Sequence, residues 1–171
     1  MKASSQKLYS VLAGLTLALF SSAPSAIERP FEIERLGNFD SPWALEFLPD
    51  GRVLVSEMSG NLKLLEEDGR FLGNVSGVPE VAYGGQGGLG EIVLHPSFER
   101  NNLVYISFAE TGEDNTYGAA IIRAKLNLSK DGGSLSSVET IWKQYPKVSG
   151  QGHFGHRITF DEAGYLWISS G

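Results

Sequence analysis

The fold is decided by residues 44–75, which read ALEFLPDGRVLVSEMSGNLKLLEEDGRFLGNV. In this stretch, short apolar runs alternate with turn signals such as Pro49-Asp50-Gly51 and Asp68-Gly69, and no run has the period of a helix. An Asp-Gly pair between two such runs is typical of a tight hairpin. The predicted strands span residues 44–48, 52–57, 61–66 and 70–75. Together they describe one antiparallel sheet of four short strands.

The same pattern recurs twice further along the chain. Strands are predicted over residues 89–94, 103–108, 119–126 and 138–142 for a second sheet, and over residues 154–160 and 165–170 for the start of a third. A constant offset relates the first sheet to the third and pairs Leu45 with Ile158, Phe47 with Phe160, Gly51 with Gly164, Val53 with Leu166, Val55 with Ile168 and Ser56 with Ser169. After a short insertion, the second sheet pairs Leu45 with Ile92, Phe47 with Leu94, Pro49 with Pro96, Val55 with Ile106 and Ser56 with Ser107. Apolar positions, turn residues and a strand-end serine therefore recur together.

Repeated four-stranded sheets of roughly 40–50 residues are the sequence signature of a β-propeller, in which each blade buries its faces against its neighbours. We therefore expect an all-β fold in which residues 27–171 form about two and a half blades. The last residue, Gly171, falls in the middle of the third blade. The sequence is accordingly expected to be the N-terminal part of a longer propeller, with an open sheet face and unpaired strand edges.

Residues 1–26 are predicted to be a secretion signal. Lys2 and Lys7 precede an apolar stretch over residues 8–20, which is too short to span a bilayer comfortably. Small residues follow, and cleavage is expected after Ser25 or Ala26. The alternative is an uncleaved N-terminal membrane anchor. No later segment is apolar enough to cross a membrane, so we expect a mature chain without a membrane span that is periplasmic or secreted.

The composition excludes several classes of function. With a formal net charge of −6 and a pI of about 5.1, the chain lacks the excess of positive charge that is typical of nucleic-acid-binding proteins. The absence of cysteine excludes disulfides, thiolate metal sites and cysteine nucleophiles. The sequence also lacks a P-loop, a nucleophile elbow and the glycine motif of dinucleotide-binding proteins.

Two residues in glycine-rich loops between the predicted blades are candidates for a site. His153 lies in the loop 150–155, and an imidazole can accept a proton near neutral pH. Gln86 lies in the segment 83–88, and its amide can donate to and accept from sugar hydroxyl groups. Loops at one face of a rigid scaffold commonly carry function. The alternatives are a histidine that only hydrogen-bonds backbone and glycines that only make a tight crossover.

Other polar and aromatic residues are interpreted as structural. His156 follows His153 by three residues, but no helix brings the two together and no third ligand is evident, so no metal site is predicted. Arg157 could pair with a carboxylate near the site, although a tie between blades is favoured. His95, before Pro96, is interpreted as part of a turn. Packing between blades is expected for the three tryptophans, Trp43, Trp142 and Trp167.

Three segments carry a family likeness. They are residues 41–51 (SPWALEFLPDG), residues 85–89 (GQGGL) leading into 95–98 (HPSF), and residues 152–158 (GHFGHRI). In order and spacing they resemble the glucose/sorbosone dehydrogenase family, which are soluble PQQ enzymes built on six-bladed β-propellers. The aldose sugar dehydrogenase branch is the most similar. The likeness extends over roughly residues 30–171 and corresponds to the first half of a family member.

The resemblance implies roles for both candidate residues. His153 would be the general base that takes a proton from the anomeric hydroxyl group while the C1 hydrogen leaves as hydride to PQQ, and Gln86 would contact the sugar. An acidic residue that orients the histidine would follow directly after Gly171, while Gly152 stands where some members have an acidic residue. The basic residues that bind PQQ and the ligands of its Ca²⁺ are expected in later blades, so no cofactor or metal ligand is assigned within this chain.

The activity that the resemblance implies is oxidation of an aldose sugar to its lactone, with electrons passed from PQQ to an external acceptor. The alternative is a non-catalytic secreted propeller that binds carbohydrate or protein, because propellers carry many functions.

Overall fold

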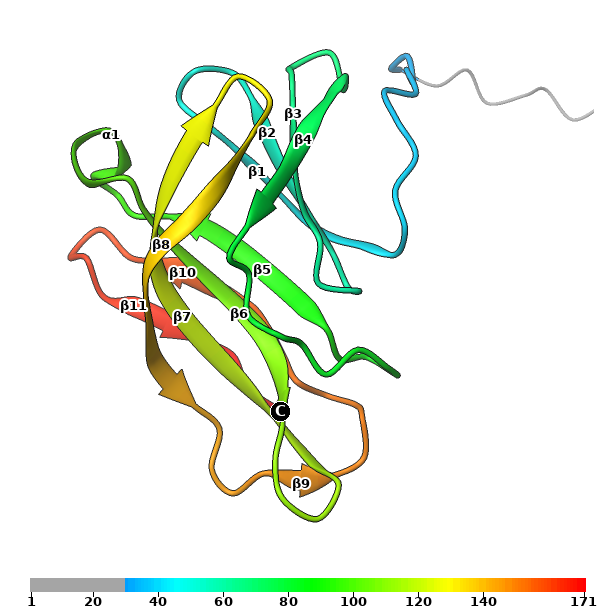
Figure 1. The fold of residues 1–171 in the computed structure, drawn as a ribbon, viewed down its shortest axis with the longest axis vertical. Coiled ribbons are helices and arrows are strands. Elements are labelled where there is room, and N and C mark those ends of the chain that lie inside the picture. The colour runs from blue at the N-terminus through cyan, green and yellow to red at the C-terminus, as the bar shows by residue number, and fades with distance from the viewer. Residues whose placement is uncertain (1–29) are drawn as a thin grey trace, which may run out of the picture. The chain divides into compact units, whose positions relative to one another are not determined.

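The computed structural model describes residues 30–171, and the predicted secretion signal over residues 1–26 lies outside the described residues. The chain divides into two units, of which the second, Arg35–Gly171, contains all the described strands and the single-turn helix α1 (Phe98–Asn101) (Figure 1). This unit is all-β apart from α1, as the sequence predicts. Among the described residues, no helix has the length and apolar character needed to cross a membrane.

The first sheet is an antiparallel meander that follows the order of the sequence. Its turns are the predicted ones. The Gly51 N–H donates to the Leu48 carbonyl at 3.0 Å, and the Gly69 N–H donates to the Glu66 carbonyl at 2.9 Å. Both glycines have a positive φ, of 89° and 83°, which residues with a Cβ rarely adopt. The strands are β1 (Pro42–Phe47), β2 (Val53–Glu57), β3 (Leu62–Leu65) and β4 (Phe71–Ser76).

The second sheet is larger than the sequence predicts, because its last two strands continue beyond their apolar runs. β7 (Thr116–Ser129) has 14 residues and β8 (Gly132–Lys143) has 12. The sheet is completed by β5 (Leu89–Leu94) and β6 (Leu103–Thr111), and the short β9 (Val148–Ser149) pairs with β7.

The first two sheets join at their outer edges, which the repeat alone does not predict. The ends of β4 and β8 pair in parallel, with Val75 opposite Gly133, so that one nine-stranded sheet results. The two backbones approach closely here, since a Cβ on Gly73 would lie 2.1 Å from the Asp131 carbonyl oxygen. Glycine at position 73 therefore permits the junction.

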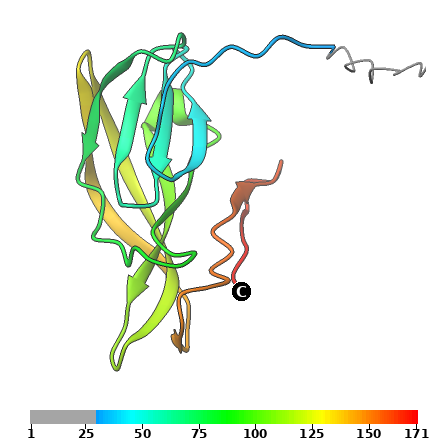
Figure 2. The ribbon, with the colours of Figure 1, turned by 90° about the vertical axis from the view of Figure 1, so that its right-hand side faces the viewer.

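The third sheet is a hairpin, β10 (Ile158–Phe160) and β11 (Leu166–Ile168), which lies beside the larger sheet as a separate small layer (Figure 2). Its pairing repeats that of the two innermost strands in the other sheets, which confirms the predicted repeat. The equivalent pairs that face each other are Leu45 and Val55, Ile92 and Ile106, and Ile158 and Ile168.

The recurring serine links the first sheet to the second. Ser56, at the end of β2, is fully buried. Its Oγ accepts a hydrogen bond from the Ala44 N–H of its own sheet at 3.0 Å and donates to the Gly90 carbonyl of the next sheet at 2.7 Å. One hydroxyl group therefore satisfies a backbone donor on one blade and a backbone acceptor on another.

Ser107 makes the same link between the second sheet and the third. Its Oγ accepts from the Glu91 N–H at 2.9 Å and donates to the His156 carbonyl, in the segment that leads into β10, at 2.7 Å. In the third sheet, Ser169 Oγ accepts from the Arg157 N–H at 3.1 Å, which repeats the first half of the pattern. The serine that the repeat singled out is thus a connection between blades.

The core fills the space between the sheets. The third sheet packs on the second through Ile158, against Tyr105 and Ile121. One apolar face of the first sheet is uncovered within the described residues, where Leu45 is 52% and Phe47 66% exposed. The largest cluster, between the first and second sheets, includes Leu54, Leu62, Leu64, Ile92, Val104, Ile106, Ile122 and Leu126.

Two polar side chains have the structural roles that the sequence favoured. Arg157 forms an ion pair with Glu91, which connects the third sheet to β5. His95 belongs to the turn after β5, where its Nδ1 accepts from the Ser97 N–H at 2.9 Å.

The expectation for the tryptophans is correct for two of the three. Trp142 packs with the cluster between the second and third sheets, and Trp43 packs edge-on against His156. Trp167 is 63% exposed in the described part of the chain, and its indole N–H donates to Asp161 at 2.9 Å. Trp167 is the repeat equivalent of Leu54, which packs in the cluster between the first and second sheets, so inter-blade packing stays a prediction for Trp167.

Ser107→Ala is expected to lower the free energy of unfolding by about 1–3 kcal/mol, because the Glu91 N–H and the His156 carbonyl would stay buried without a partner. Urea unfolding followed by tryptophan fluorescence measures the change. Ser76→Ala is the matched control, since Ser76 is exposed and its hydroxyl lies 3.4 Å from the Gly133 carbonyl. It should change stability by less than about 0.5 kcal/mol. Equal stability of the two variants would contradict the linking role.

Candidate active site

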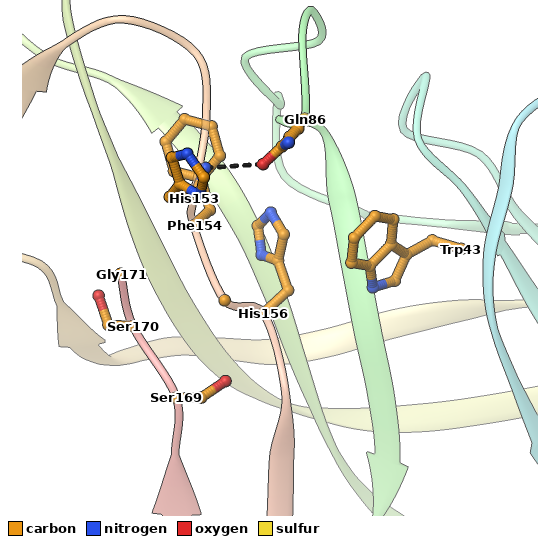
Figure 3. A pocket seen from close by; sticks show the side chains of 9 residues that line it. Trp43, Gln86, His153, Phe154, His156, Ser169, Ser170 and Gly171 are labelled. Carbon is orange, nitrogen blue, oxygen red and sulfur yellow. Dashed lines mark hydrogen bonds between the residues drawn. The ribbon is translucent and has the colours of Figure 1, made fainter.

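A pocket of about 350 Å³ lies where segments from all three sheets meet. Trp43 contributes from the start of β1, Gln86 from the loop before β5, residues 153–156 from the segment before β10, and residues 169–171 from the segment after β11. Their side chains face a common space in Figure 3. The scaffold of paired strands fixes the positions at which these loops enter, which is the usual arrangement of a site on a rigid fold.

Two glycine-rich loops that are distant in sequence are hydrogen-bonded to each other in this pocket. The Gln86 N–H donates to the Gln151 carbonyl at 2.7 Å, and the His153 N–H donates to Gln86 Oε1 at 2.8 Å. A Cβ on Gly85 would lie 2.3 Å from the Gln151 carbonyl oxygen, so this glycine permits the close approach of the two loops. The structure thereby brings together the two residues that the sequence singled out, and their chemical roles stay predictions.

The imidazole of His153 is exposed at the pocket wall, while its backbone is constrained. Its φ is 59°, and that of His156 is 64°. Residues other than glycine hold this left-handed conformation at a cost of about 1–3 kcal/mol, and such residues cluster at functional sites. The hydrogen bond from His153 to Gln86 is one of the contacts that hold the loop in this conformation.

His156 is the pocket residue that the sequence interpretation missed. It is only 2% exposed, and both ring nitrogens, Nδ1 and Nε2, are buried without a hydrogen-bond partner. Its ring packs between two aromatic side chains, with centroids 5.6 Å from Trp43 at an interplanar angle of 77°, and 5.6 Å from Phe154 at 32°. An unpaired polar ring in an aromatic setting is unusual in a folded protein.

The repeat contains a signal that could have found His156. The offset that pairs Leu45 with Ile92 and Ile158 also makes Trp43, Gly90 and His156 equivalent. Gly90 has no side chain, and a Cβ there would lie 2.7 Å from His156 Cγ. The glycine in the middle sheet therefore makes the room in which the Trp43 and His156 rings meet.

Charge is scarce in this pocket. Burial lowers the pKa of His156 to about 4, so its imidazole is neutral at neutral pH. A neutral imidazole offers one donor and one acceptor. None of the lining residues in the described part of the chain is a lysine, arginine, aspartate or glutamate. Among residues 30–171, no three His, Asp or Glu side chains are grouped so as to hold a metal ion. The arrangement suits a polar, uncharged group more than an isolated anion.

A sequence model of the family described as Glucose / Sorbosone dehydrogenase matches residues 39–171. The chain belongs to this family. The recognition made from the three sequence segments is therefore confirmed.

Several similar proteins of the glucose/sorbosone dehydrogenase family are named as sugar dehydrogenases. The aldose sugar dehydrogenase YliI of Escherichia coli K12 is 37% identical over 157 residues, which are 91% of this chain and 42% of that protein. The apo crystal structure of the soluble aldose sugar dehydrogenase of Escherichia coli superposes with a TM-score of 0.73 at 37% identity, over 77% of this chain and 38% of the other. The PQQ-bound form of the aldose sugar dehydrogenase of Streptomyces coelicolor gives 0.62 at 29% identity, over 78% and 39%.

The chain thus spans about two fifths of the length of these relatives. Together with the repeated sheets, the structural likenesses show that its fold is part of a β-propeller.

Lowering the pH from about 7 to about 5 is expected to reduce the free energy of unfolding by about 2 kcal/mol through His156 alone. Its pKa is about 4 in the folded chain against 6.5 ordinarily, so the unfolded chain binds the additional proton in this window and stability rises with pH. Urea midpoints measured across the window should show this slope in the natural protein and lose it in His156→Phe.

Carboxylates are the same in both proteins, so their contribution to the slope cancels in this comparison. This includes Glu46, whose pKa is raised by burial, and Asp50, whose pKa is lowered by the hydrogen bond from the Arg52 side chain. The same pH slope in both proteins would mean that His156 is not the group responsible.

Proposed function

We propose that this chain carries the general base and a sugar-binding side chain of a PQQ-dependent aldose dehydrogenase that oxidises an aldose to its lactone. The observation that carries the proposal is the convergence of His153 and Gln86, from two distant loops, on one pocket in a member of this family.

His153 acts as the base in this proposal. Oxidation of an aldose at C1 removes a proton from the anomeric hydroxyl group and a hydride from the carbon. The imidazole accepts the proton, and because the side chain is exposed, the proton can pass on to water. PQQ, when bound, supplies the quinone that takes the hydride, and the electrons then leave to an external acceptor.

Gln86 has two functions at once in this proposal. Its Oε1 accepts from the His153 N–H, so the side chain holds the loop of the base in place. Its amide NH₂ group then remains to donate to a sugar oxygen. One side chain would thus orient the substrate relative to the base.

The pocket fits PQQ in part. The partly exposed indole of Trp43 is a flat apolar surface on which a planar ring system can stack. The carboxylates of PQQ need cationic partners, and the described lining residues offer none. We therefore propose that the groups that bind those carboxylates and the Ca²⁺ come from outside residues 30–171.

We also propose that the enzyme is periplasmic or secreted, on the strength of the signal predicted over residues 1–26.

The test uses the protein expressed from the complete reading frame that encodes this chain, reconstituted with PQQ and Ca²⁺. Reduction of an artificial dye in the presence of D-glucose and other aldoses measures the activity. His153→Ala is expected to lower kcat by about 10²–10⁴-fold, the usual contribution of a general base. His95→Ala is the matched control, because His95 lies in a turn outside the pocket, and it should keep the rate.

Full activity in the His153→Ala protein would remove the base assignment. No dye reduction with any aldose, in natural protein that has been shown to bind PQQ, would refute the dehydrogenase proposal and favour a binding function.

A further inference from the structure

We propose that His156 hydrogen-bonds a hydroxyl group of the sugar in this pocket, at a carbon other than the one that is oxidised, and so determines which aldoses are accepted. The inference rests on the proposed function, because it takes the bound molecule to be a sugar. It concerns a side chain that the proposed reaction at His153 does not use.

The first support is that His156 lacks a partner where a polar side chain needs one. The residue is 2% exposed, and neither ring nitrogen makes a hydrogen bond. Buried polar groups are almost always paired, because leaving them unpaired is costly. In Figure 3 the ring extends toward the space between Gln86 and Trp43, which are both lining residues of the pocket. A ligand in that pocket can supply the missing partner.

The second support is the chemistry of the ring. A neutral imidazole has one donor and one acceptor, and a hydroxyl group is likewise both donor and acceptor. A hydroxyl group can therefore pair with whichever ring nitrogen faces it, whereas a carboxylate or a quinone oxygen only accepts and could pair only with the N–H. The aromatic neighbours Trp43 and Phe154 provide apolar walls of the kind that small-molecule sites use around a few fixed polar groups. The setting therefore favours a sugar hydroxyl over the charged groups of the cofactor.

The third support is that the backbone holds this ring in one place. The His156 carbonyl accepts from Ser107 Oγ at 2.7 Å, and its N–H donates to the Phe154 carbonyl at 2.8 Å. These contacts fix a left-handed φ of 64°, and Gly90 leaves the space that the ring occupies. A strained residue that its surroundings fix in this way is typical of a ligand site.

The enclosure of both nitrogens has a measurable consequence. A sugar hydroxyl reaches one of them only when the pocket wall shifts, and the new hydrogen bond then relieves one unpaired ring nitrogen. His156→Phe removes the unpaired groups while keeping an aromatic ring. We expect it to raise Tm by several degrees in the free protein and to weaken sugar binding. A ring with a purely structural role would lower Tm or leave it unchanged.

The first experiment compares D-glucose with its 2-, 3-, 4- and 6-deoxy analogues in the reconstituted protein described above. In the natural protein, loss of the hydroxyl group that His156 holds should lower kcat/KM by at least about 10-fold. In His156→Phe, kcat/KM for D-glucose should fall by a similar factor, with no further loss for that one analogue. His156→Gln, which keeps a donor and an acceptor, should restore part of the discrimination. His95→Gln should leave the profile unchanged.

The second experiment needs no turnover. The chain has three histidines, so selective ¹³C labelling at histidine Cε1 gives three signals that single substitutions assign. Titration with D-glucose should move the His156 signal and leave the His95 signal in place. If His156→Phe fails to fold, this measurement and the His156→Gln variant still decide the question.

The outcomes separate the two proposals. A His156 signal that responds to D-glucose in a protein without PQQ-dependent turnover keeps this inference and ends the proposed function. An active enzyme in which the His156 signal stays fixed and His156→Phe shows the natural deoxy-sugar profile overturns this inference and leaves the proposed function in place. A protein that shows neither response overturns both.

Discussion

The hydrogen bonds of Ser56 and Ser107 are the constraint on which the site depends. Each hydroxyl accepts from the innermost strand of its own sheet and donates to the backbone of the next, so neighbouring sheets cannot slide past each other without leaving buried polar groups unpaired. The two acceptors, the carbonyls of Gly90 and His156, are equivalent positions of the repeat. The bond from Ser107 therefore fixes the position of the segment that carries His156 into the pocket.

Much of the fold could be predicted because it is local and repeated. Gly51 and Gly164, one repeat apart, both close a turn with a positive φ near 90°, and alternating apolar residues set the same strand register in each sheet. The junction of β4 with β8 could not be predicted. It depends on two backbones meeting at Gly73, a contact between distant segments that leaves no periodic signal. The extended ends of β7 and β8 carry mostly polar residues, so hydrophobic alternation did not reveal them.

Site residues could be predicted from the sequence where their role follows from the composition of their loop, but not where it follows from burial of the side chain. Gln86 and His153 lie in glycine-rich loops, and the structure brings them within one hydrogen bond of each other. His156 lies three residues further along the same segment, and only the fold shows that its ring is enclosed while that of His153 is exposed. Two imidazoles of one loop thus differ in the property that sets acid–base behaviour, namely contact with water.

The uncovered face of the first sheet has a consequence for what lies beside it in a complete propeller. Leu45 and Phe47 are exposed, whereas Ile92 and Ile158, which are equivalent to Leu45, are buried against the preceding sheet. The face therefore has the apolar character of a surface that receives a neighbouring blade. In a closed propeller the last blade meets the first, so this face is expected to be covered where the ring closes.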